Sequence, residues 1–227
     1  MAKGNRGGRR TTPNTSSPVG PRTYGNMTDQ EAQDIRDEYD DLYEPSVLDA
    51  IKQYISKATD LSGYSMAQNL NHKLENDMKL NANEKFMVKY LTQGMHDLGK
   101  DTMLYRGAHE DLLQKLGVQN YQNYSESQLK QMLIGSSFKS KSFTSTSYDK
   151  NKNPFYTGPN SGGREVELVI KAPSNSKMVF GARSQTEVIL GMGTNFRVTN
   201  VSYTGRQATP RNAINPMKVV QLELEVY

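Results

Sequence analysis

The spacing of apolar residues changes near position 100, and this change limits the fold more than any other feature of the 227-residue sequence. Before it, apolar side chains recur every three or four residues, as at Val47 and Ile51, which is the period of an amphipathic helix. After it, short apolar runs are separated by clusters of Gly, Pro, Asn and Ser, and the last run alternates, with Leu222 and Leu224 flanking an acid. Helices first and antiparallel strands afterwards predict an α+β fold.

The pattern predicts one domain at 27–227, with a helical part at 27–100 and a strand-rich core at 101–227. The helices are expected at 27–41, 46–55, 66–78 and 86–98, with Ser46 capping the second and Gly99 closing the fourth. The strands are expected at 103–107, 142–148, 166–171, 178–180, 187–190, 196–203 and 219–227, with brief helices at 112–116 and 125–133.

Residues 1–26 are predicted to be a disordered basic tail, because they carry five basic residues, no acid and almost nothing to bury. Such a tail would make a weak, salt-sensitive contact with nucleic acid or another acidic surface, or would act only as a solubilising leader. The net charge of +4 is divided along the chain, because residues 27–50 carry nine acids against Arg36 alone. The sequence therefore lacks the basic stripe expected of a duplex-binding domain.

Several classes of protein are disfavoured by what the sequence does not contain. No apolar run approaches the roughly 18 residues of a membrane span, and no apolar segment follows the basic N-terminus, so neither Sec export nor membrane insertion is expected. The absence of cysteine excludes disulfides and thiolate catalysis. His72, His96 and His109 show no ligand spacing, so no metal is expected.

The stretch 180–190 is the strongest candidate for a functional site. Its first half is turn-like, and its second half is a short apolar run that begins at Val188. Glu187 lies at the junction, where a strand can fix the carboxylate while the loop leaves it open to a ligand. Gln185 would point the same way in an extended backbone, so an amide and a carboxylate would face one cleft. The alternative is a polar residue that caps an edge strand.

Two motifs upstream of this stretch support its interpretation as a functional site. Arg106 follows Leu104-Tyr105 on the first expected strand, and Ser145 lies within Phe143-Thr-Ser-Thr-Ser147 on the second. Together with Gln185-x-Glu187 they resemble the R-S-E signature of the mono-ADP-ribosyltransferases. The helical segments Ala50-Ile51-x-x-Tyr54 and Leu70-Asn71-x-x-Leu74 are similar to the lead-in of the clostridial Rho-modifying exoenzymes and related actin-modifying toxins.

The resemblance implies a mixed, mainly antiparallel core of two sheets and NAD as the substrate, without a metal. It also implies transfer of one ADP-ribose to a macromolecule, with NAD hydrolysis as a side reaction. A phage or bacterial effector or toxin of this kind would act in the cytoplasm of a host or target cell, by a delivery route that the sequence does not specify.

The roles of the site residues are likewise those that the resemblance implies. Arg106 would clamp the paired anion of the pyrophosphate, for which a planar guanidinium is well suited. Glu187 would stabilise positive charge on the ribose as the nicotinamide bond breaks, and Ser145 would hold both Glu187 and the ribose. The remaining expected contacts with NAD come from Thr146 and Ser147, which would also brace the strands, and from Asn71 and Phe180.

Gln185 bears on the acceptor, because the arginine-modifying relatives have a glutamate at that place. A neutral amide suits an acceptor that needs no strong base, such as an asparagine or another uncharged side chain, or a guanine base. The sequence favours a host protein as the acceptor. A nucleic-acid acceptor and a non-catalytic binding or structural module on the same fold stay open as alternatives.

Overall fold

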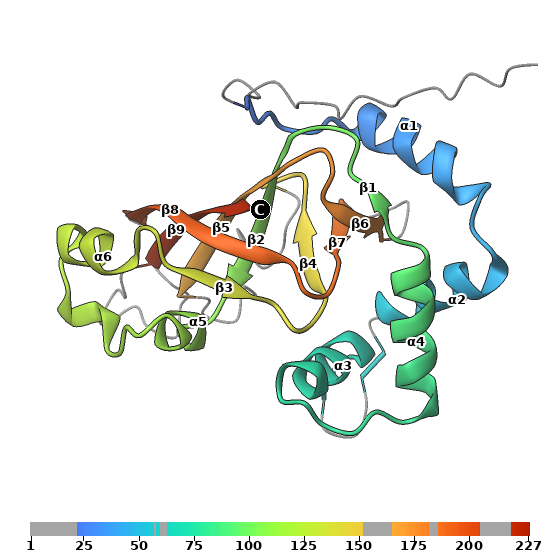
Figure 1. The fold of residues 1–227 in the computed structure, drawn as a ribbon, viewed down its shortest axis with the longest axis horizontal. Helices are drawn as coiled ribbons and strands as arrows, with labels where there is room; N and C mark the ends of the chain where they lie inside the picture. The colour runs from blue at the N-terminus through green and yellow to red at the C-terminus, as the bar shows by residue number, and fades with distance from the viewer. Residues whose placement is uncertain (1–21, 57, 60–62, 152–164, 182–185, 205–218) are drawn as a thin grey trace, which may run out of the picture.

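The computed structural model describes residues 22–56, 58–59, 63–151, 165–181, 186–204 and 219–227. Four helices precede the first strand along the chain, and the described part is an α+β fold as predicted (Figure 1). The first four helices are α1 (Asp29–Asp40), α2 (Pro45–Tyr54), α3 (Met66–Glu75) and α4 (Ala82–Gln93). Later come α5 (Asp111–Lys115), the 3₁₀ turn η1 (Tyr121–Asn123) and α6 (Glu126–Leu133).

Local sequence signals explain most of the helix ends. Capping boxes begin α1, α3, α4 and α6, and in each the N-cap side chain accepts a backbone bond three residues on. The second helix differs from the prediction, because Pro45 occupies its first turn and Glu44, not Ser46, is the N-cap. Helix α4 ends at Gly94 rather than Gly99. An added Cβ at Gly94 would lie 2.4 Å from Cγ1 of Val47, so the close packing of α2 on α4 requires glycine here.

The strands form one mixed sheet in the order β1-β6-β7-β4-β2-β5-β9-β8-β3. All neighbours are antiparallel except β5 and β9. The expected division into two sheets is wrong, because the described strands form a continuous ladder. The join is narrow, since β2 and β4 share only the pair Tyr105–Ser147. The strands are β1 (His96–Asp97), β2 (Thr102–Ala108), β3 (Ser137–Lys139), β4 (Thr144–Ser147), β5 (Val166–Ala172), β6 (Lys177–Phe180), β7 (Glu187–Leu190), β8 (Asn195–Thr204) and β9 (Val219–Val226).

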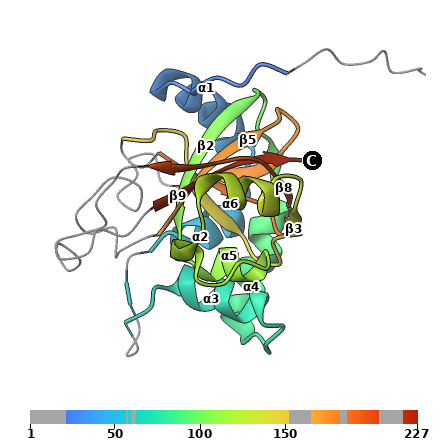
Figure 2. The ribbon, with the colours of Figure 1, turned by 90° about the vertical axis from the view of Figure 1, so that its left-hand side faces the viewer.

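Two hydrophobic cores lie on opposite faces of β6 and β7. The first core contains side chains of α1, α5 and α6 together with most of the sheet, and α5 and α6 lie in front of the strands in Figure 2. The second core lies between α2, α3 and α4 and the strands β6 and β7. Val188 and Leu190 enter the first core, whereas Ile189 enters the second. Alternate residues of β7 therefore face different halves of the molecule.

The chain joins the sheet a few residues earlier than predicted. The backbone N–H of Met103 donates to Gly25 O at 2.9 Å, and the Tyr105 hydroxyl donates to Asn26 Oδ1 at 2.7 Å. Met27 is buried in the first core. The boundary between tail and domain therefore lies before Gly25 rather than after Asn26, and the tail upstream of Arg22 falls outside the described residues. None of the described helices is long and apolar enough to cross a membrane.

Candidate active site

Glu187 is the first residue of β7, and the alternation of this strand decides where its carboxylate lies. Because Ile189 enters the second core, the Glu187 side chain lies on the same side of the strand, toward α2 and α3. The residue is partly buried and pairs with Ser147 of β4. An added Cβ at Gly181 would lie 2.9 Å from Glu187 Oε2, so the glycine after β6 leaves the carboxylate its space. The strand thus fixes the position of the acid at its first residue.

Ser145, in the middle of β4, joins the predicted residues. Ser145 pairs with Ile189 across the two strands, so its side chain lies on the same sheet face as Glu187 and acts on the pKa of that carboxyl. Its hydroxyl lies 3.3 Å from the Tyr54 hydroxyl, and its carbonyl oxygen accepts a 2.9 Å bond from Arg106 Nη1. The structure therefore brings Ser145, Glu187 and Arg106 together, although they are far apart along the chain.

The electrostatics of the cluster are set by burial. Burial raises the pKa of Glu187, although the hydrogen bond from Ser145 and the charge of Arg106 oppose this rise. Burial also lowers the pKa of Arg106, which nearby Tyr54 and Glu187 partly offset. The carboxylate is thus less well solvated than an exposed glutamate. A positive charge that develops next to it would be stabilised more strongly than in water.

Thr146 and Ser147 brace the two strands rather than point into open space. The Thr146 hydroxyl donates to Val188 O at 2.7 Å. The Ser147 hydroxyl lies 2.6 Å from Thr186 Oγ1 and donates to Asp149 O at 2.8 Å. Both hydroxyls are already engaged within the protein, which fits the bracing role expected for them.

Tyr54 is a member of the cluster that sequence reasoning placed only in the helical lead-in. Its ring is 1% exposed and packs edge-on against Phe143, with ring centroids 5.7 Å apart. Its hydroxyl accepts a 2.9 Å bond from Asn71 Nδ2 and reaches Ser145. Asn71 is therefore linked to the site through Tyr54, and its own Oδ1 is buried without a partner among the described residues. The sequence signal that could have indicated this role is a tyrosine at the end of an apolar helix face.

Two predicted residues are not part of this cluster. The Phe180 ring is 5% exposed and lies in the first core, where the Arg36 guanidinium stands 4.7 Å from its centroid. Because Phe180 pairs with Val188, its side chain points to the face opposite Glu187. The expected contact between Phe180 and NAD is therefore not supported. Gln185 lies outside the described residues.

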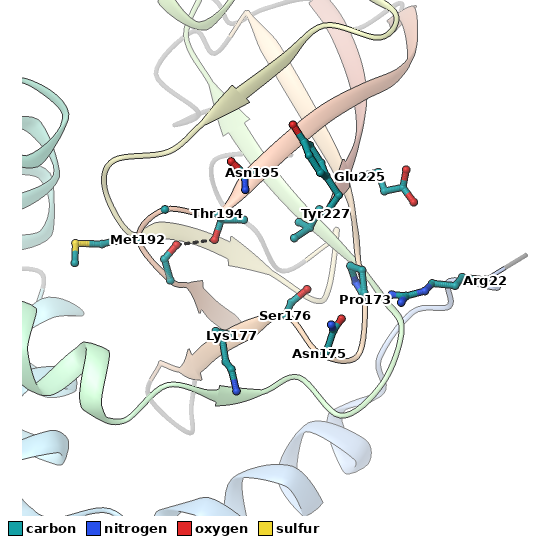
Figure 3. Close-up of a pocket in the computed structure, with 13 residues that line it drawn as sticks. Arg22, Pro173, Asn175, Ser176, Lys177, Met192, Thr194, Asn195, Glu225 and Tyr227 are labelled. Carbon is teal, nitrogen blue, oxygen red and sulfur yellow. Dashed lines mark hydrogen bonds between the residues drawn. The ribbon is translucent and has the colours of Figure 1, made fainter. Parts of the chain in front are cut away.

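A separate hollow of about 560 Å³ lies at the other end of β7 (Figure 3). Ser176, Lys177, Thr194 and Asn195 are among the residues that line it, and none of the predicted site residues does. We therefore keep the cluster around Glu187 as the candidate active site. Within the described ranges, no group of three or more His, Cys, Asp or Glu side chains could hold a metal ion.

Comparison with known proteins identifies the class. The sequence pattern of the ADP-ribosyltransferase exoenzyme family matches residues 28–219, which include Arg106, Ser145 and Glu187. The family and the fold are thus those of an NAD-dependent ADP-ribosyltransferase of the toxin type, with NAD as its substrate. The chain belongs to the ADP-ribosyltransferase exoenzyme family. No protein with a curated description matches the sequence.

Solved structures of similar fold come from related toxins. Plx2a, an ADP-ribosyltransferase toxin from Paenibacillus larvae, has 14% identity and a TM-score of 0.64, covering 88% of this chain and 96% of its own. An ADP-ribosyltransferase from Clostridium botulinum has 17% identity and a TM-score of 0.61, covering 90% of this chain and 99% of its own. BECa, an ADP-ribosylating toxin of C. perfringens solved with NADH, has 15% identity and a TM-score of 0.64, covering 87% of this chain and 47% of its own.

Proposed function

We propose that this enzyme is a mono-ADP-ribosyltransferase that modifies an uncharged side chain of a host protein and hydrolyses NAD as a side reaction. The observation that carries this proposal is the contact of Glu187 with Ser145, whose carbonyl oxygen is held by Arg106. The three residues come from three strands, β7, β4 and β2.

The bond broken is the one between C1′ of the ribose and the nicotinamide nitrogen, and its electron pair leaves with nicotinamide. Glu187 is proposed to stabilise the positive charge that develops on the ribose, because its carboxylate is partly desolvated. The acceptor atom then forms a new bond to C1′ and loses its proton. When water takes the place of the acceptor, the product is free ADP-ribose.

Arg106 is proposed to anchor the pyrophosphate, since a guanidinium presents several fixed donors to paired phosphates. Ser145 would orient Glu187 and the ribose, and the chain Asn71–Tyr54 would hold Ser145 in turn. Removal of one such preorganised electrostatic contact typically costs about a hundred- to a thousandfold in rate.

The acceptor is proposed from Gln185, whose neutral amide can orient an uncharged nucleophile but does not supply the base that a guanidinium needs. An asparagine side chain fits this chemistry, and so does a guanine base. A protein acceptor is the better candidate, because the basic residues are concentrated only in the tail and are spread diffusely over residues 51–227. A tail of about five cations gives weak, salt-dependent binding to nucleic acid.

The test uses NAD labelled in its adenylate part, incubated with the enzyme and a cell lysate. Label that becomes macromolecular and is released by protease but not by nuclease supports the proposal. Label released by nuclease instead would favour the guanine alternative. Absence of both labelling and nicotinamide release would favour a binding module on a transferase fold.

A further inference from the structure

Glu75, the last residue of α3, holds the turn that leads into β4. Its Oε1 accepts a 2.7 Å bond from the Ser142 hydroxyl and a 3.2 Å bond from the Ser142 backbone N–H. Its Oε2 lies 3.4 Å from Lys115 Nζ of α5. One carboxylate therefore connects α3, α5 and the turn before β4.

The position of this acid is unfavourable for the helix itself. A negative charge in the last turn of a helix opposes the macrodipole. Burial alone would raise the pKa of Glu75, but the hydrogen bonds from Ser142 and the charge of Lys115 outweigh it and hold the pKa below its usual value. The charged form is thus stabilised by its contacts with the turn and with α5, not by the helix.

The turn held by Glu75 is also bonded to the connection between β7 and β8. The Ser140 hydroxyl donates to Ser142 O at 2.9 Å. The Ser140 backbone donates to Thr194 O at 3.0 Å and accepts from Gly193 N at 2.8 Å. Residues 193 and 194 lie between the end of β7 at Leu190 and the start of β8 at Asn195. The same turn is therefore bonded to the connection that follows the Glu187 strand, and it leads into the strand that carries Ser145.

Helix α3 reaches β4 at a second point, one helical turn earlier. Asn71 lies four residues before Glu75, which places both on one face of the helix. Asn71 binds the Tyr54 hydroxyl, and Tyr54 reaches Ser145. The charge of Glu75 also acts on Arg106. The helix therefore bears on the candidate active site through two side chains.

We propose that Glu75 is a positioning residue for cleavage of the nicotinamide bond. Its carboxylate fixes the start of β4 and, through the turn at Ser140, the connection that follows β7, so that Ser145 and Glu187 keep their separation. This inference rests on the proposed roles of Ser145 and Glu187.

The test is Glu75→Gln, which keeps the shape but replaces charge-assisted hydrogen bonds with neutral ones of about half the strength. We expect kcat for nicotinamide release to fall about tenfold, because a misplacement of about 1 Å can cost as much as a hundredfold. The KM for NAD should stay unchanged or fall, since a negative charge near Arg106 is removed. Ser142→Ala should lower kcat similarly, and the double variant should add little, since the two residues share one interaction.

Asp77→Asn is the matched control. Asp77 forms an exposed ion pair with Lys141 and so joins the same end of α3 to the same turn, and its loss should leave kcat unchanged. If wild type and Asp77→Asn release nicotinamide and Glu75→Gln has the same kcat as wild type, this inference is overturned, whereas the proposed function stands. If wild type releases none, the proposed function fails, and amide hydrogen exchange at residues 142–147 decides the inference. Exchange no faster in Glu75→Gln and Ser142→Ala than in Asp77→Asn would overturn it.

Discussion

Glu187 is held in an environment that favours its neutral form, although its proposed role needs the charge. Its folded-state pKa is raised above the ordinary value of 4.5, with burial as the main cause. Between the unfolded and the folded pKa the folded state binds more protons, so the stability of wild type falls as the pH rises through that window. Such a loss of stability is expected where a catalytic group is held ready for its role in a partly desolvated place.

Substitution of Glu187 by Gln should therefore raise the melting temperature at pH 7 while it lowers nicotinamide release. The gain should shrink as the pH falls through the raised pKa and should be absent once the acid is protonated in both states. Calorimetric scans of both proteins from pH 7 to pH 4 measure this. A melting temperature that is lower in the variant at pH 7 would show that the carboxylate is stabilising.

Gly181 should be sensitive to a single added methyl group. Its Cβ in Gly181→Ala would lie 2.9 Å from both Cβ and Oε2 of Glu187, so the carboxylate must move. We expect kcat for nicotinamide release to fall roughly ten- to a hundredfold, because misplacement of a reacting group by about 1 Å costs that much.

Gly191→Ala is the control for this change, because it lies at the other end of β7 and its nearest contact would be an ordinary 3.6 Å. Its kcat should stay within about twofold of wild type. Equal losses in the two variants would mean that glycine is needed for the backbone and not for the space around Glu187.

At the scale of single residues, the sequence identified those that belong to short motifs. Arg106, Ser145 and Glu187 were predicted from three short motifs in sequence, and the structure brings the three together. Tyr54 was missed because its contact with Ser145 joins residues 91 apart. Phe180 was misplaced because its proximity to Glu187 in sequence says nothing of the strand face, which the pairing with Val188 decides.

At the scale of elements, the Tyr54 hydroxyl joins α2 and α3 to Ser145 of β4. In Tyr54→Phe the Asn71 amide loses its partner in a buried place, so the free energy of unfolding should fall by about 1–3 kcal/mol. Nicotinamide release should fall as well, because Ser145 loses a neighbour on α2. Urea denaturation and the rate of nicotinamide release measure the two effects.

Tyr43→Phe separates this effect from the loss of any tyrosine hydroxyl. The Tyr43 hydroxyl is buried and has no hydrogen-bond partner in the part of the chain that the structure describes. Its removal should leave the free energy of unfolding within about 0.5 kcal/mol of wild type or raise it. Similar losses in both variants would argue against a specific role of Tyr54.

The elements themselves were predicted where the local signal is strong. The helices with capping boxes and the strands with apolar runs are confirmed, apart from shifts of a few residues at their ends. Strand β1 was predicted as the end of a helix, since Met95 and Leu98 continue the helical spacing. It is a strand because His96 pairs with Met178 of β6. A pairing between residues so far apart in sequence cannot be predicted from a local pattern.

At the scale of the whole molecule, the sheet count was the main error. The two groups of strands that were expected as separate sheets meet through a single residue pair between β2 and β4. Arg106 follows Tyr105 on β2, and Ser145 lies two residues before Ser147 on β4. The candidate active site therefore lies at the join of the two groups, which explains how residues from distant segments can act together.

The domain boundary can be tested by two truncations that differ by six residues. Removal of residues 1–20 should leave nicotinamide release and stability unchanged. Removal of residues 1–26 should lower the melting temperature, since Met103 and Tyr105 lose the bonds that they make with Gly25 and Asn26. Identical melting temperatures would show that residues 25 and 26 contribute nothing to the fold and that the boundary lies after Asn26.

The central claim is that Glu187 serves the cleavage of NAD itself, whereas Gln185 serves only the incoming acceptor. The most direct test measures released nicotinamide and labelled acceptor side by side in Glu187→Gln and Gln185→Ala. We predict that Glu187→Gln lowers both by about two or more orders of magnitude, because it removes the charge that meets the ribose cation. Gln185→Ala should keep most nicotinamide release and abolish labelling. A loss of nicotinamide release in Gln185→Ala as severe as in Glu187→Gln would contradict this division of roles.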